Sequence, residues 1–226
     1  MKKVVEHLDV TQDKIDSNSF DVHWYRRVFH AFGACFLFYY MLPDTFWLNL
    51  LKFWVPIFII VFAVLLEISR LKGFISSDYF FGLRNYEKKR FGSYLFFGFA
   101  LFILLMFFPQ QIAIPCILCG CFADPIIGEA RFRFSKIRVY FIGFLICVIF
   151  FMVSWLNADL WLILLVSFVG ASGALVGEIK KFWWLDDDFI IQILPAVLLV
   201  LLFLILTQFG FEITFEQIIY PGNMPW

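Results

Sequence analysis

Seven long apolar runs constrain the fold of this chain more than any other feature. They cover residues 28–42, 50–68, 94–108, 111–128, 139–156, 160–177 and 189–209. A perpendicular membrane span needs ~20 apolar residues, with a range of ~17–25, and the third run reaches that range when it is extended back to about Gly92. Only helices satisfy every backbone group within their own segment in lipid, and these runs are too long for barrel strands. The sequence therefore predicts an all-α, polytopic bundle of about seven transmembrane helices.

Lysine and arginine lie almost entirely on one side of this layout. Seventeen of the 18 fall in the N-terminal segment and in the loops that share its side, and Lys52 is the exception. The segments on the other side carry neither residue; they are 43–49, 109–110, 157–159 and the tail after Gln208. Because positively charged loops stay cytoplasmic, we expect an N-in, C-out protein of the cell membrane.

This layout divides the chain into three parts. Residues 1–25 are polar and lack the pattern of a secretory signal peptide, so we expect a cytoplasmic N-terminal arm. Residues 26–210 would form the transmembrane helical domain that holds any catalytic site, and 211–226 an extracytoplasmic tail. The net charge is zero, and we expect the bilayer, but no nucleic acid, as a partner. The oligomeric state stays open.

Asp124 is the most informative polar residue. It ends an uncharged stretch, and Pro125 breaks or kinks the helix beside it. Gly128 would leave room for a ligand next to the carboxylate. A charged group deep in a membrane segment is costly and usually faces the bundle interior or water. We therefore favour a functional Asp124 over a helix-end acid that only pairs with a nearby arginine.

Further ionisable residues gather at the same membrane edge. Helical spacing places them on shared faces, and they fall into three groups: Arg26, Arg27 and His30; Glu67 and Arg70; and Arg84 and Glu87. Each group taken singly also fits a structural role, as a lipid anchor or an ion pair.

The sixth run ends in a G-x-x-x-G pair, Gly173 and Gly177, which predicts close helix packing. Packing does not account for Glu178 or for the run Asp186–Asp188 that follows. Acids in the first turn of a helix are favoured by its dipole. Three consecutive acids, however, carry more negative charge than helix capping needs. A divalent cation would neutralise them.

One edge thus combines carboxylates, cationic side chains and a histidine. Carboxylates hold Mg²⁺, arginine and lysine neutralise charge on a transferred phosphoryl group, and a base accepts the proton of the attacking hydroxyl. This set is typical of phosphoryl or nucleotidyl transfer from a nucleoside triphosphate. The chain has neither a P-loop nor a kinase Gly-rich loop, so membrane helices and their loops would hold the nucleotide.

Five short motifs resemble, in the same order, those of the membrane CTP-dependent lipid kinases. This family includes dolichol, phytol and CTP-dependent diacylglycerol kinases, and it is related to the phosphatidate cytidylyltransferases. The motifs begin at Arg26-Arg27-Val-Phe-His30, Glu67-Ile-Ser-Arg70, Tyr86-Glu87, Ala123-Asp124-Pro125 and Gly177-Glu178. The likeness is strongest to archaeal-type dolichol kinase-like sequences. The chain departs from the family after Asp124, where it lacks the K-S-x-E-G element, and at Asp188, where asparagine is usual.

The resemblance implies a kinase that transfers the γ-phosphoryl group of CTP to the hydroxyl of a polyprenol-type lipid, with Mg²⁺ as cofactor. The implied metal ligands are Asp124, Glu178 and Asp187. The implied contacts to the nucleotide phosphates are Arg26, Arg27, Arg84, Gly128, Arg131 and Lys136. Glu67, Arg70 and Glu87 would support the site, and His30 would be either the catalytic base or a structural group.

Two alternatives stay open. The first is cytidylyl transfer to a phosphatidate-like lipid, which would use nearly the same residues. The second is a lipid transporter or a non-catalytic lipid-binding protein. A transporter more often shows inverted repeats and polar groups near the bilayer midplane, whereas the polar groups here gather at one edge.

Overall fold

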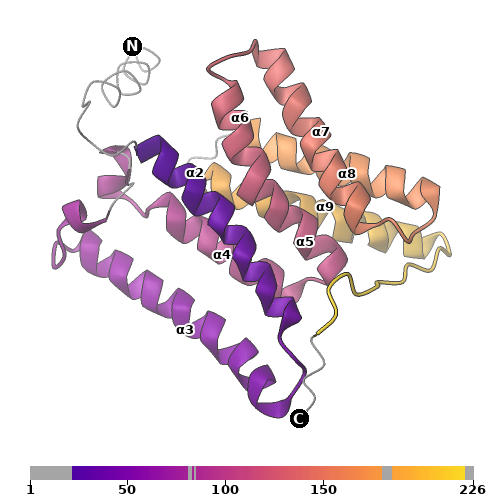
Figure 1. Ribbon diagram of the computed structural model, residues 1–226, viewed down its shortest axis with the longest axis horizontal. Coiled ribbons are helices and arrows are strands. Elements are labelled where there is room, and N and C mark those ends of the chain that lie inside the picture. The colour runs from indigo at the N-terminus through magenta and orange to yellow at the C-terminus, as the bar shows by residue number, and fades with distance from the viewer. Residues whose placement is uncertain (1–21, 81–82, 84, 180–184, 222–226) are drawn as a thin grey trace.

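The computed structural model describes residues 22–80, 83, 85–179 and 185–221, and helices are the only regular secondary structure within these ranges (Figure 1). The longer helices are α2 (Val22–Phe32), α3 (Phe46–Leu71), α4 (Ser93–Phe107), α5 (Gln110–Leu118), α6 (Asp124–Ala130), α7 (Lys136–Ser154), α8 (Leu160–Ile179) and α9 (Asp187–Gln208). Shorter turns are the 3₁₀ segments η1 (Gly33–Met41), η2 (Ser77–Tyr79) and η3 (Asn85–Lys89) and the π-helical segment η4 (Cys119–Ala123). The all-helical prediction is confirmed.

Five helical stretches are long and apolar enough to cross a membrane. They are Phe46–Leu71, Gln110–Ala130, Lys136–Ser154, Leu160–Glu178 and Asp187–Gln208. The third predicted run falls on α4, which is apolar but shorter, and the first falls on α2 and η1. Within the described residues α2 starts at Val22, ahead of the expected boundary at 26. All seven runs therefore overlap helices, while the number of spans and the orientation stay predictions.

Helices α5 to α9 form the main body of the bundle, α2 runs beside it and in front of α4, and α3 lies along one edge (Figure 1). Only 6% of the most apolar stretch of α3 is buried within the protein, whereas 67% of the stretch 110–130 is buried. Large apolar side chains cover the exposed face of α3, among them Trp54, Phe58 and Phe62. A helix that is apolar all round and unburied fits a lipid environment.

Glycines bring α8 and α9 into close contact, as the G-x-x-x-G pair predicts. A methyl group built on Gly173 would lie 2.9 Å from Cα of Pro195, and one on Gly177 would lie 2.9 Å from the backbone carbon of Ile190. Only residues without a side chain leave room for this approach. The packing fixes the end of α8, which carries Glu178, against the start of α9.

Two prolines interrupt the helix that carries Asp124. Pro115 lacks an N–H, so the Gln111 carbonyl loses its helical donor, and the indole N–H of Trp155 donates to that carbonyl at 2.9 Å. Before Pro125 the helix widens into η4, where the N–H of Asp124 donates to the carbonyl of Cys119, five residues back. Such π-helical turns recur at functional sites, and this one turns Asp124 toward α2 and α9.

Candidate functional site

The site centres on His30, Asp124 and Asp188, which we call the carboxylate–histidine cluster. One ligand atom from each of the three lies within 4.8 Å of the others. The Nδ1 atom of His30 is 3.4 Å from Asp124 Oδ2, and its Nε2 atom is 3.6 Å from Asp188 Oδ2. The side chains of His30 and Asp188 are 7% and 3% exposed, and that of Asp124 is 21% exposed. The cluster thus joins α2, α6 and α9, with Asp124 on its more open side.

The structure brings Arg26 to the same cluster, but with different partners from those the sequence implied. Arg26 precedes His30 by one helical turn, and its guanidinium lies 3.3 Å from Glu87 and 3.5 Å from Asp188. Its side chain is 14% exposed and that of Glu87 only 1%. Arg26 therefore neutralises two buried acids and fixes the position of Asp188, while η3 contributes Glu87.

A backbone turn and an amide form the inner wall of the cluster. The Nδ1 atom of His30 is 3.4 Å from the carbonyl oxygen of Gly120 in the π-helical turn. A methyl group on Gly120 would lie 2.5 Å from Cγ of Gln192, so the amide packs directly on this turn. Gln192 donates to the carbonyl of Asp188 at 2.9 Å, and its buried Oε1 atom has no hydrogen-bond partner among the described residues.

Glu178 adjoins the cluster from the end of α8. Its Oε1 atom accepts a hydrogen bond from Arg131, and its buried Oε2 atom has no hydrogen-bond partner in the part of the chain described. The negative charges of Asp124 and Asp187 both act on this carboxylate. An acid that is 3% exposed is stabilised by a cation in such surroundings. Arg131 supplies one positive charge, and the second oxygen is available to a metal ion.

The sequence interpretation named Asp187 as the metal ligand and Asp188 only as a member of the acidic run, whereas the structure places Asp188 in the cluster. Asp187 lies in a second group of acids with metal-ligand spacing, Asp186–Asp188, but Asp188 alone belongs to both groups. A signal was present in the sequence. Gln192, a polar residue within an apolar helix, lies four positions after Asp188 and so on the same inward helix face.

Glu67 and Arg70 form a buried ion pair that shapes the loop between α3 and α4. Arg70 Nη2 is 3.0 Å from Glu67 Oε1, and both side chains are fully buried. Arg70 also donates to the carbonyls of Lys88 and Arg90, at 3.2 and 2.6 Å, and the N–H of Gly92 donates to Glu67. The pair thus holds the segment that carries Glu87 beside the cluster.

A further ion pair connects this loop with the start of α9. The guanidinium of Arg90 lies 3.6 Å from Asp186, whose side chain is 2% exposed. Asp186 also caps α9 by accepting a hydrogen bond from the N–H of Asp188. The first acid of the run is thereby used for capping and loop attachment, which separates its role from that of Asp188.

The other residues predicted to contact the nucleotide phosphates lie at different distances and orientations from the cluster. Arg27 turns away from the cluster and pairs with Glu129 at 2.6 Å. Lys136 is exposed in the first turn of α7. A methyl group on Gly128 would meet no atom within 4 Å, so the space expected there exists. Arg84 lies outside the described residues.

The cluster has the chemistry of a divalent-cation site. Carboxylate oxygens suit Mg²⁺ and Mn²⁺, and an imidazole nitrogen extends the set to transition metals. Without a cation, Asp188 depends on Arg26 for neutralisation. A scan against known protein families, a search of curated proteins and a search of solved structures found no match for this chain.

Proposed function

We propose that the protein is a membrane lipid kinase that transfers the γ-phosphoryl group of a nucleoside triphosphate, CTP in the first instance, to the hydroxyl of a polyprenol- or dolichol-type lipid. The observation that carries the proposal is the convergence of His30, Asp124 and Asp188 within 4.8 Å at the ends of apolar helices. In this proposal the cluster would lie at the membrane edge, where it could meet the hydroxyl group of a lipid.

In this proposal Asp124 and Asp188 would hold Mg²⁺, and the buried second oxygen of Glu178 would complete the acidic set. A magnesium ion usually takes one or two carboxylates together with phosphate oxygens and water. Arg131 and Lys136, joined by Arg84 from the sequence, neutralise the charge of the triphosphate. Arg26 acts by positioning Asp188 rather than by contact with the nucleotide.

His30 is the proposed base. Its imidazole lies between two carboxylates, an arrangement that fixes the orientation of the ring. His30 would accept the proton of the lipid hydroxyl as the oxygen attacks the γ-phosphorus. The bond between the γ-phosphorus and the bridging oxygen then breaks, and the nucleoside diphosphate leaves.

Cytidylyl transfer is the second candidate, and one feature favours it. The two metal-capable groups share Asp188, and adjacent sites for two metals are typical of nucleotidyl transfer, in which one ion activates the nucleophile and the other stabilises the leaving group. Such an enzyme would transfer CMP to a phosphatidate-type lipid and release pyrophosphate.

Labelled CTP separates these reactions. Purified protein in detergent, supplied with Mg²⁺, is incubated with CTP labelled at either the γ- or the α-phosphorus and with a polyprenol or a phosphatidate acceptor. Transfer of the γ-label to polyprenol supports the kinase, and transfer of the α-label to phosphatidate with release of pyrophosphate supports the cytidylyltransferase. ATP in parallel tests the nucleotide. The absence of transfer from folded protein with every acceptor would contradict both and favour a non-catalytic lipid-binding protein or transporter.

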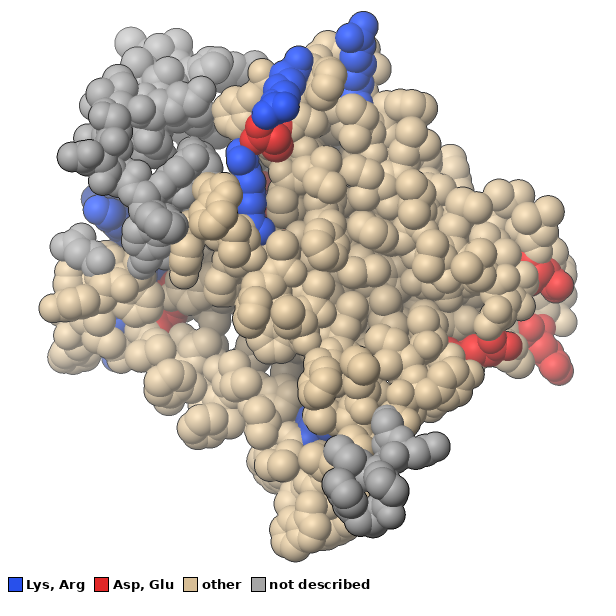
Figure 2. Space-filling view, in the orientation of Figure 1, with Lys and Arg blue, Asp and Glu red and all other residues tan. Residues whose placement is uncertain are grey.

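The proposal includes a topology of seven spans, N-in and C-out, with the site on the cytoplasmic side. The distribution of charged side chains supports this topology. On the face shown in Figure 2, most lysine and arginine side chains lie toward the upper and left edges, and several acidic side chains lie at the right edge.

A further inference from the structure

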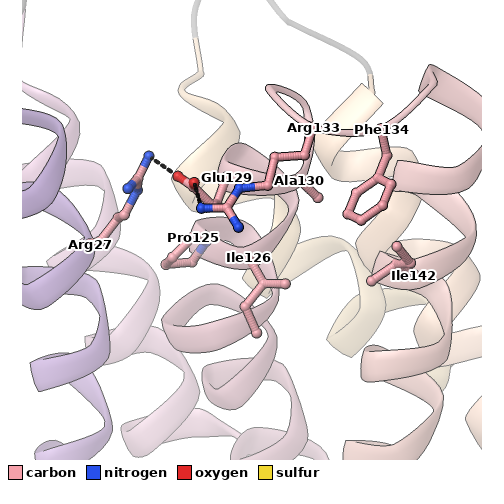
Figure 3. A pocket seen from close by; sticks show the side chains of 8 residues that line it. All are labelled: Arg27, Pro125, Ile126, Glu129, Ala130, Arg133, Phe134 and Ile142. Atoms are coloured by element: carbon pink, nitrogen blue, oxygen red, sulfur yellow. Dashed lines mark ion pairs between the residues drawn. The ribbon is translucent and has the colours of Figure 1, made fainter.

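A groove with a volume of about 420 Å³ opens beside α6, and its walls come from α2, α6, α7 and the turn between α6 and α7 (Figure 3). Helix α6 contributes Pro125, Ile126, Glu129 and Ala130 to it. At 100° per residue these four positions centre on the face opposite Asp124. The groove is therefore separate from the carboxylate–histidine cluster.

Two arginines meet one glutamate at the rim of this groove. Arg27 Nη2 is 2.6 Å from Glu129 Oε2, and Arg133 Nη2 is 3.2 Å from Glu129 Oε1. The side chains of Arg27, Arg133 and Glu129 are 33%, 71% and 38% exposed, respectively. Their summed formal charge is +1. Each guanidinium has five N–H groups in a planar fork. One carboxylate engages a single nitrogen of each, so the rim can still bind the oxygens of a phosphate, which guanidinium groups recognise with matching geometry.

The wall beneath this rim is apolar. Figure 3 shows Ile126 below Glu129 and Ile142 below Phe134, whose ring lies at about the height of the Arg133 side chain. Ile126 and Phe134 are 42% and 48% exposed, and Ile142 lies on α7, which is long and apolar enough to cross a membrane. A phosphate group at the rim would thus continue into an apolar substituent along the wall. Inorganic phosphate or a nucleotide would leave this wall uncovered, whereas a phospholipid would cover it.

We propose that this groove binds one anionic phospholipid, with its phosphate between Arg27 and Arg133 and the first carbons of an acyl chain against Ile126, Phe134 and Ile142. Basic pockets between membrane helices at the headgroup level bind acidic lipids in this way. The inference is independent of phosphoryl transfer, because it uses none of the three cluster residues. Glu129 sets the affinity, since it competes with the lipid phosphate for the same guanidinium groups.

The test measures lipid binding without any assay of activity. Purified full-length protein in a neutral detergent is titrated with phosphatidylglycerol or phosphatidylcholine, and the bound lipid is counted by native mass spectrometry. We expect preferential binding of phosphatidylglycerol. Arg133→Gln should weaken it about fivefold, since a basic residue near the membrane surface is worth ~1 kcal/mol toward an anionic lipid. Glu129→Gln should strengthen it, and Ile142→Trp, which fills the wall, should weaken it.

Arg138→Gln is the matched control, because Arg138 is exposed on the first turns of α7 but does not line the groove. Equal losses in the Arg133 and Arg138 variants would overturn the proposal in favour of diffuse charge attraction, and so would a Glu129 variant that binds less lipid. Displacement of the lipid by millimolar inorganic phosphate, with no effect of Ile142→Trp, would assign a free-phosphate site instead. Thermal unfolding in detergent verifies that each exposed-site variant is folded before its affinity is compared.

Discussion

The carboxylate of Asp188 lies 3.6 Å from Nε2 of His30, and the same oxygen lies 3.5 Å from the guanidinium of Arg26. Asp188 thereby joins α9 to two residues on successive turns of α2. With Asp124 on the far side of the imidazole at 3.4 Å, His30 lies between two acids from different helices. This geometry assigns Asp188 a role that its neighbour Asp187 does not share.

The first prediction compares these two neighbours. Asp188→Asn should lower the rate of phosphoryl transfer by about 100-fold or more, the size of effect seen when one preorganised electrostatic group is lost. Asp187→Asn should cost less than about tenfold. Both variants keep the shape of the side chain, and initial rates at saturating Mg²⁺ compare them. A larger loss in the Asp187 variant would restore the original assignment of the metal ligand.

Asp124→Asn should nearly abolish turnover while the protein still folds and inserts. The substitution removes one of the two carboxylates that face His30 and a negative charge beside Glu178, so the cation would lose a ligand. A Mg²⁺-dependent transfer assay measures the effect. Asp159→Asn serves as the control, since Asp159 is exposed in the turn between α7 and α8. If the Asp124 variant kept the wild-type rate, Asp124 would be a structural helix-end acid.

The sequence was sufficient to predict features that depend on long runs or on regular spacing. Apolar runs identified every long helix, and Gly173 and Gly177 predicted the close approach of α8 and α9. Asp124 was singled out because charge in an apolar segment is costly, and His30 because helical spacing places it on one face with Arg26 and Arg27. The structure places the two side chains together, although no local pattern relates a residue of α2 to one of α6.

The sequence did not predict which of two adjacent polar residues faces the cluster. Neighbours on a helix point about 100° apart, so Arg26 faces Asp188 while Arg27 faces Glu129, and Asp188 faces His30 while Asp187 does not enter that cluster. Which neighbour turns inward depends on the rotation of each helix, and tertiary packing sets that rotation. The i, i+4 relation between Asp188 and Gln192 was the one local clue.

A third prediction concerns the buried pair of α3. Arg70→Met should destabilise the protein by about 3–5 kcal/mol, because it leaves the Glu67 carboxylate buried without its cation and removes the donors to the carbonyls of Lys88 and Arg90. Thermal unfolding in detergent and limited proteolysis of the loop after α3 would both report the loss. Lys72→Met is the control, since Lys72 is exposed two residues later. An Arg70 variant as stable as the control would show that the pair does not hold the loop.

The fourth prediction tests the contact between α8 and α9. Gly177→Ala should destabilise the protein by about 1–3 kcal/mol, the usual cost of overpacking, because the added methyl group would meet the backbone of α9 at 2.9 Å. Gly98→Ala on α4 adds the same methyl group where the nearest atom is 4.0 Å away, and we expect it to be neutral or slightly stabilising. Unfolding midpoints in one detergent compare the two variants. Equal midpoints would mean that the helices separate at no cost.

The last prediction concerns orientation, and it depends on one lysine. Lys52 is the single cation assigned to the side opposite the basic loops, and the structure pairs it with Asp44, whose Oδ1 atom lies 2.9 Å from its Nζ atom. One lysine against the 17 basic residues of the opposite side is too few to reverse the separation of basic residues that directs insertion. Reporter fusions at Gln12 and after Trp226 should therefore report opposite compartments, with the first in the cytoplasm. Asp44→Asn should leave this result unchanged, because acidic residues contribute little to orientation. Both reporters in one compartment would contradict the seven-span layout and would require an even number of crossings.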